Sequence, residues 1–151
     1  MDLRAFENEV LTSLKEEMSC YQSLLDLTEK EKKIVGSVKN NSMQFSIFNK
    51  KDKIVKQINE LDNKSQPMKK TWLKNREYLS KKSVNTAEGL LEKMKATIER
   101  VLVIEKEIED LVSTELENIK NELKTMANQR ETFNGYNNRG VSLPKFMDIK
   151  G

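Results

Sequence analysis

The chain has 151 residues, a mass of 17.6 kDa and a formal net charge of +3, which fits one domain and points to no particular partner. Its 36% hydrophobic and 34% charged residues, with only 5 Gly and 2 Pro, favour long thin helices and exclude a turn-rich β-sandwich or barrel. Because it has no histidine and one cysteine, we expect no enzyme, no catalytic residue, no cofactor and no metal site.

The first predicted element is an amphipathic helix over residues 3–35, which contains neither Gly nor Pro. Gly36 is expected to end this helix. Cys20 is expected to be a small buried hydrophobe, because no histidine exists to activate its thiol. The unpaired cysteine, the absence of a secretory-signal pattern and the lack of a membrane-length apolar run predict a cytoplasmic location. The apolar row alternates steps of three and four: Leu11, Leu14, Met18, Tyr21, Leu25 and Thr28.

A second periodic segment follows, and one proline interrupts it. Pro67 lacks a backbone donor and clashes with the preceding turn, so a kink or break is expected over residues 63–66. The register continues across it, which predicts that both halves face one partner. Phe45 and Phe48 are interpreted as core anchors. The row consists of Ile47, Ile54, Ile58, Leu61, Met68, Trp72 and Leu79.

This middle part of the chain is also basic. Residues 49–82 carry 11 basic and 4 acidic side chains, whereas residues 1–34 carry 5 and 8 and residues 83–133 carry 7 and 11. Such a segment either binds nucleic acid or packs beside its acidic neighbours. The second interpretation is favoured, because only Trp72 and Tyr78 offer rings for base stacking.

The third predicted helix is the longest, with Asn85 and Thr86 as its expected N-cap. No Gly or Pro intervenes between Leu90 and Asn134, and at ~1.5 Å per residue this stretch predicts a rod of about 65 Å. Three glutamates, Glu105, Glu115 and Glu122, fall in its row, so either part of the helix is exposed or the seam shifts to Ile104, Leu111, Leu116 and Leu123. The row itself is Leu91, Met94, Ile98, Val101, Ile108, Val112, Ile119, Met126 and Phe133.

Residues 134–151 differ in composition from the helices. Glycines, asparagines and Pro144 indicate a flexible tail, so we expect a helical domain over 1–133 and a tail over 134–151. The tail nevertheless contains Tyr136, Leu143 and Phe146, which predicts either a strap folded onto the helices or a short binding motif. The expected fold is all-α, an elongated antiparallel bundle or coiled coil of three main helices, the second broken near Pro67.

Taken in order, these segments resemble the FlgN-type family of flagellar export chaperones over nearly the whole chain. The opening helix of leucines and glutamates is LTSLKEEMSCYQSLLDLTEKEKKIV, and the next, with its lysine-rich centre, is NNSMQFSIFNKKDKIVKQINELD. The long third helix and an aromatic, basic tail complete the likeness. The tail reads YNNRGVSLPKFMDIKG, in which PKFMDIKG is the most distinctive element.

The resemblance implies a cytoplasmic chaperone that binds the C-terminal helical parts of hook-filament junction (hook-associated) proteins, keeps them unpolymerised and delivers them to the export gate. A docking role at the cytosolic domain of the gate would fall to Tyr136. We expect a monomer or weak homodimer that does not insert into membranes. By position, the client surface would comprise Ile108, Val112, Ile119, Leu123, Met126 and Phe133.

Two other functions fit parts of the sequence. Three-four spacing with Lys and Glu between the apolar residues is equally typical of a homodimeric coiled-coil rod or adaptor. Nucleic-acid binding is not expected, although it would use the lysines of the basic middle. These are Lys50, Lys51, Lys53, Lys56, Lys69 and Lys70.

Overall fold

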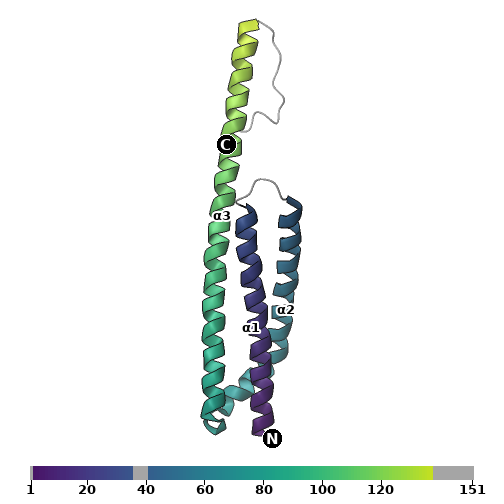
Figure 1. The fold of residues 1–151 in the computed structure, drawn as a ribbon, viewed down its shortest axis with the longest axis vertical. Helices are drawn as coiled ribbons and strands as arrows, with labels where there is room; N and C mark the ends of the chain where they lie inside the picture. The colour runs from purple at the N-terminus through teal and green to yellow at the C-terminus, as the bar shows by residue number, and fades with distance from the viewer. Residues whose placement is uncertain (1, 36–40, 138–151) are drawn as a thin grey trace. The chain divides into compact units, whose positions relative to one another are not determined.

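The computed structural model describes residues 2–35 and 41–137, nearly all of them helical and none in a strand, so the all-α class is confirmed. The elements are α1 (Leu3–Val35), α2 (Asn41–Lys74), the short 3-10 helix η1 (Arg76–Tyr78) and α3 (Lys81–Asn137) (Figure 1). The chain divides into two compact units, Met1–Ile108 and Glu109–Gly151, which are described in turn as unit 1 and unit 2.

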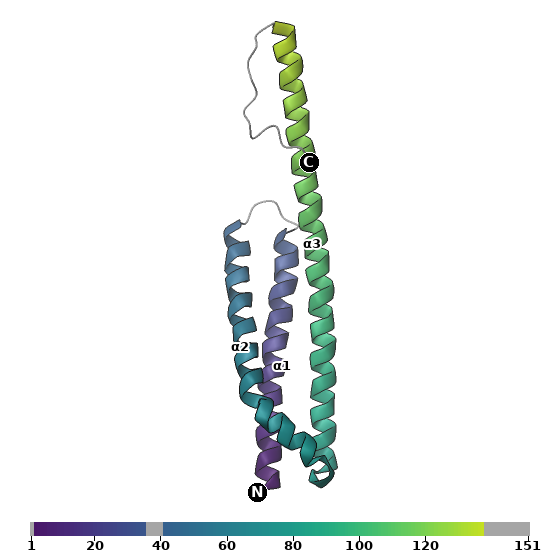
Figure 2. The same cartoon turned by 180° about the vertical axis from the view of Figure 1, so that it is seen from behind.

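Unit 1 is an antiparallel bundle in which α1 runs beside both α2 and the first part of α3 (Figures 1 and 2). Each helix contributes its apolar stripe to a shared core, because a stripe is stable only when it is covered. Phe6 and Trp72 meet in this core with ring centroids 6.3 Å apart. Its fully buried members are Val10, Leu14, Trp72, Leu79, Ala87 and Met94.

α1 has the predicted bounds and the predicted buried face. It ends at Val35, directly before Gly36, and all six residues of its row are buried or half-buried. Cys20 is buried with 8% of its surface exposed, which confirms its interpretation as a small buried hydrophobe. Burial, followed by the nearby carboxylates of Glu16 and Glu17, raises the pKa of this thiol and disfavours the thiolate.

α2 continues through Pro67, so the helix is kinked and not interrupted. Its direction changes in the C-terminal part, where it crosses towards the start of α3 (Figure 2). Trp72 is buried on the same core as Val10, as the continued register predicts. The assignment of Phe45 and Phe48 to the core is wrong, since they are 68% and 62% exposed. Ile47 takes the inward position there, and Phe45, two residues earlier, is turned by about 200° from it.

α3 begins at Lys81, several residues before the expected N-cap. Ser80 Oγ accepts a hydrogen bond from the Ser83 backbone N–H at 3.3 Å. The Glu7 carboxylate of α1 accepts three more, from Ser80 N–H (2.7 Å), Ser80 Oγ (3.1 Å) and Ser83 Oγ (2.9 Å). These contacts replace the cap expected at Asn85, and the hydrogen bond from the Ser80 backbone is the main reason that the pKa of Glu7 is lowered.

Candidate interaction surfaces

Unit 2 presents an apolar face of α3 with large exposed side chains. Val112 is 40% exposed, Leu116 56% and Ile119 46%, while Met126 is 48% exposed and Leu123 is half-buried. Steps of four, three, four and three place them on one side of the helix. We call this surface the α3 stripe, and it comprises Val112, Leu116, Ile119, Leu123 and Met126.

The α3 stripe contains four of the client-site residues expected from the sequence: Val112, Ile119, Leu123 and Met126. Leu116 joins them, although the original row passes over it at Glu115. Ile108 does not belong to this surface, because it is 7% exposed and buried within unit 1. Phe133 and Tyr136 fall within the helical span, but their side chains lie outside the described residues.

Charged residues of opposite sign follow the two edges of the α3 stripe. Glu115 and Glu122 lie on one edge, and Lys120 lies on the other with Lys124 further round the helix, as the rotation of about 100° per residue requires. All four are exposed. This is the arrangement by which the edges of a coiled-coil seam select the charge pattern and register of a partner.

Within unit 1, α3 has a fully covered seam. Met94, Val101, Ile104 and Ile108 are 1–7% exposed, whereas Leu91 and Ile98 are on the edges, 49% and 36% exposed. Ile104 takes the covered position that Glu105 occupies in the original row, while Val101 and Ile108 of that row stay buried. The complete shift to Ile104, Leu111, Leu116 and Leu123 is wrong, because Leu111 is 40% and Leu116 is 56% exposed. The other alternative, that part of the helix is exposed, is confirmed by the stripe of unit 2.

Part of the basic middle pairs with acidic neighbours on other helices. Lys51 contacts Glu31 of α1 at 3.2 Å and also forms an ion pair with Glu105 of α3. Outside the basic middle, Lys32 of α1 pairs with Glu107 of α3, a contact that lowers the pKa of the carboxyl group. Glu105 therefore interrupts the apolar row of α3 as an ion-pair partner.

A second polar contact joins α1 to α2. Glu17, 4% exposed, accepts hydrogen bonds from Ser65 Oγ (2.8 Å) and Lys69 Nζ (3.1 Å). Lys69 also binds Asp62 at 3.0 Å. Burial alone would lower the pKa of Lys69, but the hydrogen bonds to Asp62 and Glu17 outweigh it and raise the pKa overall. With Trp72 buried as well, this segment serves the packing of unit 1.

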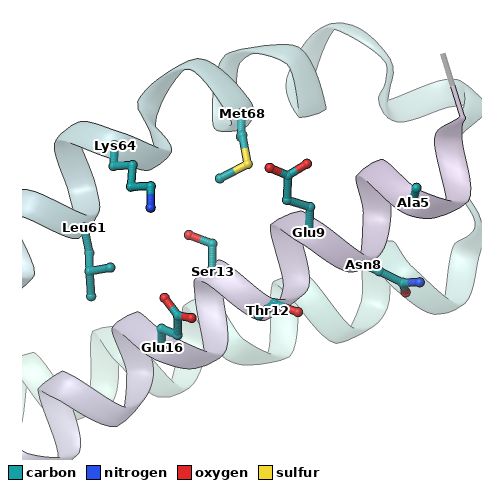
Figure 3. Close-up of a pocket in the computed structure, with 9 residues that line it drawn as sticks. All are labelled: Ala5, Asn8, Glu9, Thr12, Ser13, Glu16, Leu61, Lys64 and Met68. Carbon is teal, nitrogen blue, oxygen red and sulfur yellow. The ribbon is translucent and has the colours of Figure 1, made fainter.

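The grooves between the described residues of α1 and α2 include two with volumes of several hundred cubic ångströms. The first, of about 440 Å³, has Leu61 and Met68 beside the carboxylates of Glu9 and Glu16 and the ammonium group of Lys64 (Figure 3). Because both signs of charge meet there, it selects no single class of ligand. The second, which we call the lysine-rimmed groove, has a volume of about 330 Å³. Its lining is Leu27, Lys30, Lys33, Ile34, Met43, Ser46, Ile47 and Lys50.

Residues 2–35 and 41–137 contain neither a candidate metal site nor a candidate membrane span. No group of three or more His, Cys, Asp or Glu side chains that could hold a metal ion occurs there. None of the helices in that part of the chain has the length and apolar character needed to span a bilayer.

The chain matches a known protein family. Residues 1–143 match the family described as FlgN protein, which covers nearly the entire chain, including α1, α2 and α3. No curated protein and no solved structure matches the chain.

Proposed function

The chain belongs to the FlgN family of flagellar export chaperones, and from that premise we propose that it binds hook-filament junction proteins in the cytoplasm. It binds their C-terminal helical regions, prevents their premature assembly and delivers them to the export gate. The observation that carries this proposal is the α3 stripe, an apolar helix face whose members are about half exposed in unit 2.

An amphipathic client helix can cover this face with its own residues at i, i+3, i+4 and i+7. Fully burying an aliphatic side chain contributes about 1.5–3 kcal/mol, so covering the exposed half of four residues contributes roughly 4 kcal/mol before ordering costs. The client surface that enters the contact is then unavailable for polymerisation. Met126 suits more than one client, because its unbranched side chain adapts to different shapes.

The client surface that we propose comprises the α3 stripe together with Phe133. Ile108 is left out, because it is already buried in unit 1. The charged edges favour a client helix with basic residues opposite Glu115 and Glu122 and acidic residues opposite Lys120. The tail that we propose, residues 134–151, begins within the last turn of α3, and Tyr136 is assigned to docking at the cytosolic domain of the gate.

Binding of a labelled C-terminal helical fragment of a hook-filament junction protein tests the proposal. With methyl-labelled methionine, the Met126 signal should move on binding, while that of Met94, 5% exposed in the core, should stay. Tyr136→Ala should retain the fragment and lose capture by the gate domain. An unmoved Met126 signal at saturating fragment would refute the assignment of the surface.

A homodimeric coiled coil is the second candidate, favoured by the charges on the α3 stripe. In a parallel pair of stripes, Glu115 of one copy would face Lys120 of the other, as flanking seam positions five residues apart do. Light scattering over a range of concentrations separates the two functions. A monomer or weak dimer that binds the client supports the chaperone, and a stable dimer that ignores the client supports the rod.

A further inference from the structure

The lysine-rimmed groove is a second apolar surface, formed where the C-terminal half of α1 runs beside the N-terminal half of α2. Leu27 and Ile34 come from α1, and Met43 and Ile47 come from α2. Ile47 is 7% exposed and packed into the bundle, whereas Met43 is 49% exposed, so a partner can contact the groove through Met43. Its volume of about 330 Å³ lies within the range of ~300–1,000 Å³ typical of ligand pockets.

Three lysines surround this floor. Lys30 and Lys33 of α1 and Lys50 of α2 are all exposed, and none of them forms an ion pair with another described residue. The next residue along α2, Lys51, differs, because its side chain is 13% exposed and pairs with Glu31 and Glu105. Lys51 is thus paired inside the bundle, whereas no carboxylate of the described residues forms an ion pair with the three lysines around the groove.

We propose that the lysine-rimmed groove is a docking site for an acidic amphipathic helix. Apolar side chains of that helix enter between Leu27, Ile34 and Met43, and its flanking carboxylates pair with Lys30, Lys33 and Lys50. This site is separate from the proposed client surface, because every lining residue belongs to unit 1 and none to the α3 stripe. The site therefore gives the protein a second binding surface beyond its proposed chaperone function.

The shape and composition of the groove favour a helix over other anionic partners. A concave apolar floor accepts side chains that project from a cylinder, whereas an anionic bilayer would present a flat surface to it. Single-stranded nucleic acid is bound largely by stacking on aromatic rings, and no aromatic side chain is among the lining residues. Charge complementarity and apolar contact are satisfied together only by the amphipathic acidic segment.

Three methionines in the full-length protein report on three separate surfaces. Met43 lines the lysine-rimmed groove, Met68 lines the mixed-charge groove and Met126 belongs to the α3 stripe. The probe is a synthetic amphipathic helical peptide with leucines on one face and glutamates on both flanks, and its counterpart carries lysines in place of the glutamates. In methyl-labelled protein, the acidic peptide should shift the Met43 signal and leave Met68 and Met126 unchanged.

The affinity measurement uses a charge-reversed variant and a matched control. Reversal of all three rim lysines to glutamate should weaken binding of the acidic peptide by about tenfold or more and remove its salt dependence. The control reverses three exposed lysines outside the groove, Lys15, Lys70 and Lys93, and should bind like the unaltered protein although its net charge is the same. Equal urea midpoints show that both variants remain folded.

Several results would overturn the inference. The lysine-flanked peptide binding as tightly as the acidic one would remove the electrostatic basis, and a shift of Met68 or Met126 in place of Met43 would move the site elsewhere. Equal weakening in the control variant would reduce the effect to net charge. Vesicles of anionic lipid that bind the protein and displace the peptide would identify a membrane-binding surface.

Discussion

Replacement of Ile119 by glutamate tests whether the α3 stripe binds a client or only belongs to a solvated helix. Ile119 lies at the centre of the stripe and is 46% exposed. Covering the exposed half of an isoleucine contributes about 1 kcal/mol, so Ile119→Ala should weaken the client complex about fivefold. Ile119→Glu also places a carboxylate against apolar surface, and a total loss of about 3 kcal/mol, more than hundredfold in Kd, is expected.

The matched control is Asn121→Glu, which adds the same charge to the same helix. Two residues rotate the position by about 200°, so Asn121 lies on the opposite side of α3 from Ile119. Its replacement should leave client binding within about twofold of the unaltered protein, since a lone surface charge is worth little. Fluorescence anisotropy with a labelled client fragment measures both affinities, and circular dichroism measures helical content.

Two outcomes would refute this reasoning. If Ile119→Glu binds the fragment as tightly as the unaltered chain, the stripe is not the client surface. If both variants lose binding equally, the cause is net charge. A fall in helical content for Ile119→Glu alone would instead assign Ile119 to the core of a larger assembly, such as the homodimer.

Contacts inside unit 1 give three further expectations, each measured by urea unfolding. Because folding lowers the pKa of Glu7, the ionised carboxylate stabilises the fold above its ordinary pKa of 4.5, and this stabilisation is lost as the pH falls through the lower pKa of the folded state. Glu7→Gln should therefore make the free energy of unfolding less dependent on pH in the acidic range. Glu17→Ala should lower the free energy of unfolding by about 2–3 kcal/mol, because it removes a buried carboxylate that accepts hydrogen bonds from both Ser65 and Lys69. An unchanged urea midpoint would rule these contacts out as stabilising. Phe48→Ser should change the free energy of unfolding by less than about 0.5 kcal/mol, because Phe48 is exposed, whereas Ile104→Ala should lower it by about 2–5 kcal/mol, because Ile104 is buried. A larger loss for Phe48→Ser than for Ile104→Ala would contradict the burial of these two residues.

Helix periodicity was sufficient to predict α1 and the continued register of α2. The row from Leu11 to Thr28 is buried or half-buried, because in α1 the same three-four spacing that forms a helix face also meets two neighbouring helices. The row through Trp72 survives Pro67 because a kink keeps the helical rotation while changing its direction. The spacing of apolar residues predicts burial correctly where the face that it marks on a helix is also the face that neighbouring helices cover.

The errors arise where a contact joins distant parts of the chain. Nothing near Ser80 indicates that Glu7, 73 residues earlier, accepts the hydrogen bonds at the start of α3. Phe45 and Phe48 are large and apolar, yet spacing alone does not say whether another helix covers their side of α2. Helix boundaries and burial thus depended on partners that a single periodic row does not specify.

The candidate client site was partly predictable for the same reason. Val112, Ile119, Leu123 and Met126 could be placed on one face from spacing, but the point at which α3 passes from covered to exposed could not. The lengths explain it in retrospect: α3 has 57 residues, and α1, with 33, cannot cover all of it. Ile108 was therefore assigned to the client surface although it is buried.

The reactivity of the Cys20 thiol reports how often the helices of unit 1 separate. Its thiol is the only one in the chain, it is 8% exposed, and its pKa is raised, so it should react with a disulfide reagent chiefly when α1 moves away from its neighbours. At high reagent concentration the reaction rate approaches the rate of that opening. If the thiol reacts more slowly when a partner helix is bound, the partner also slows the opening of unit 1.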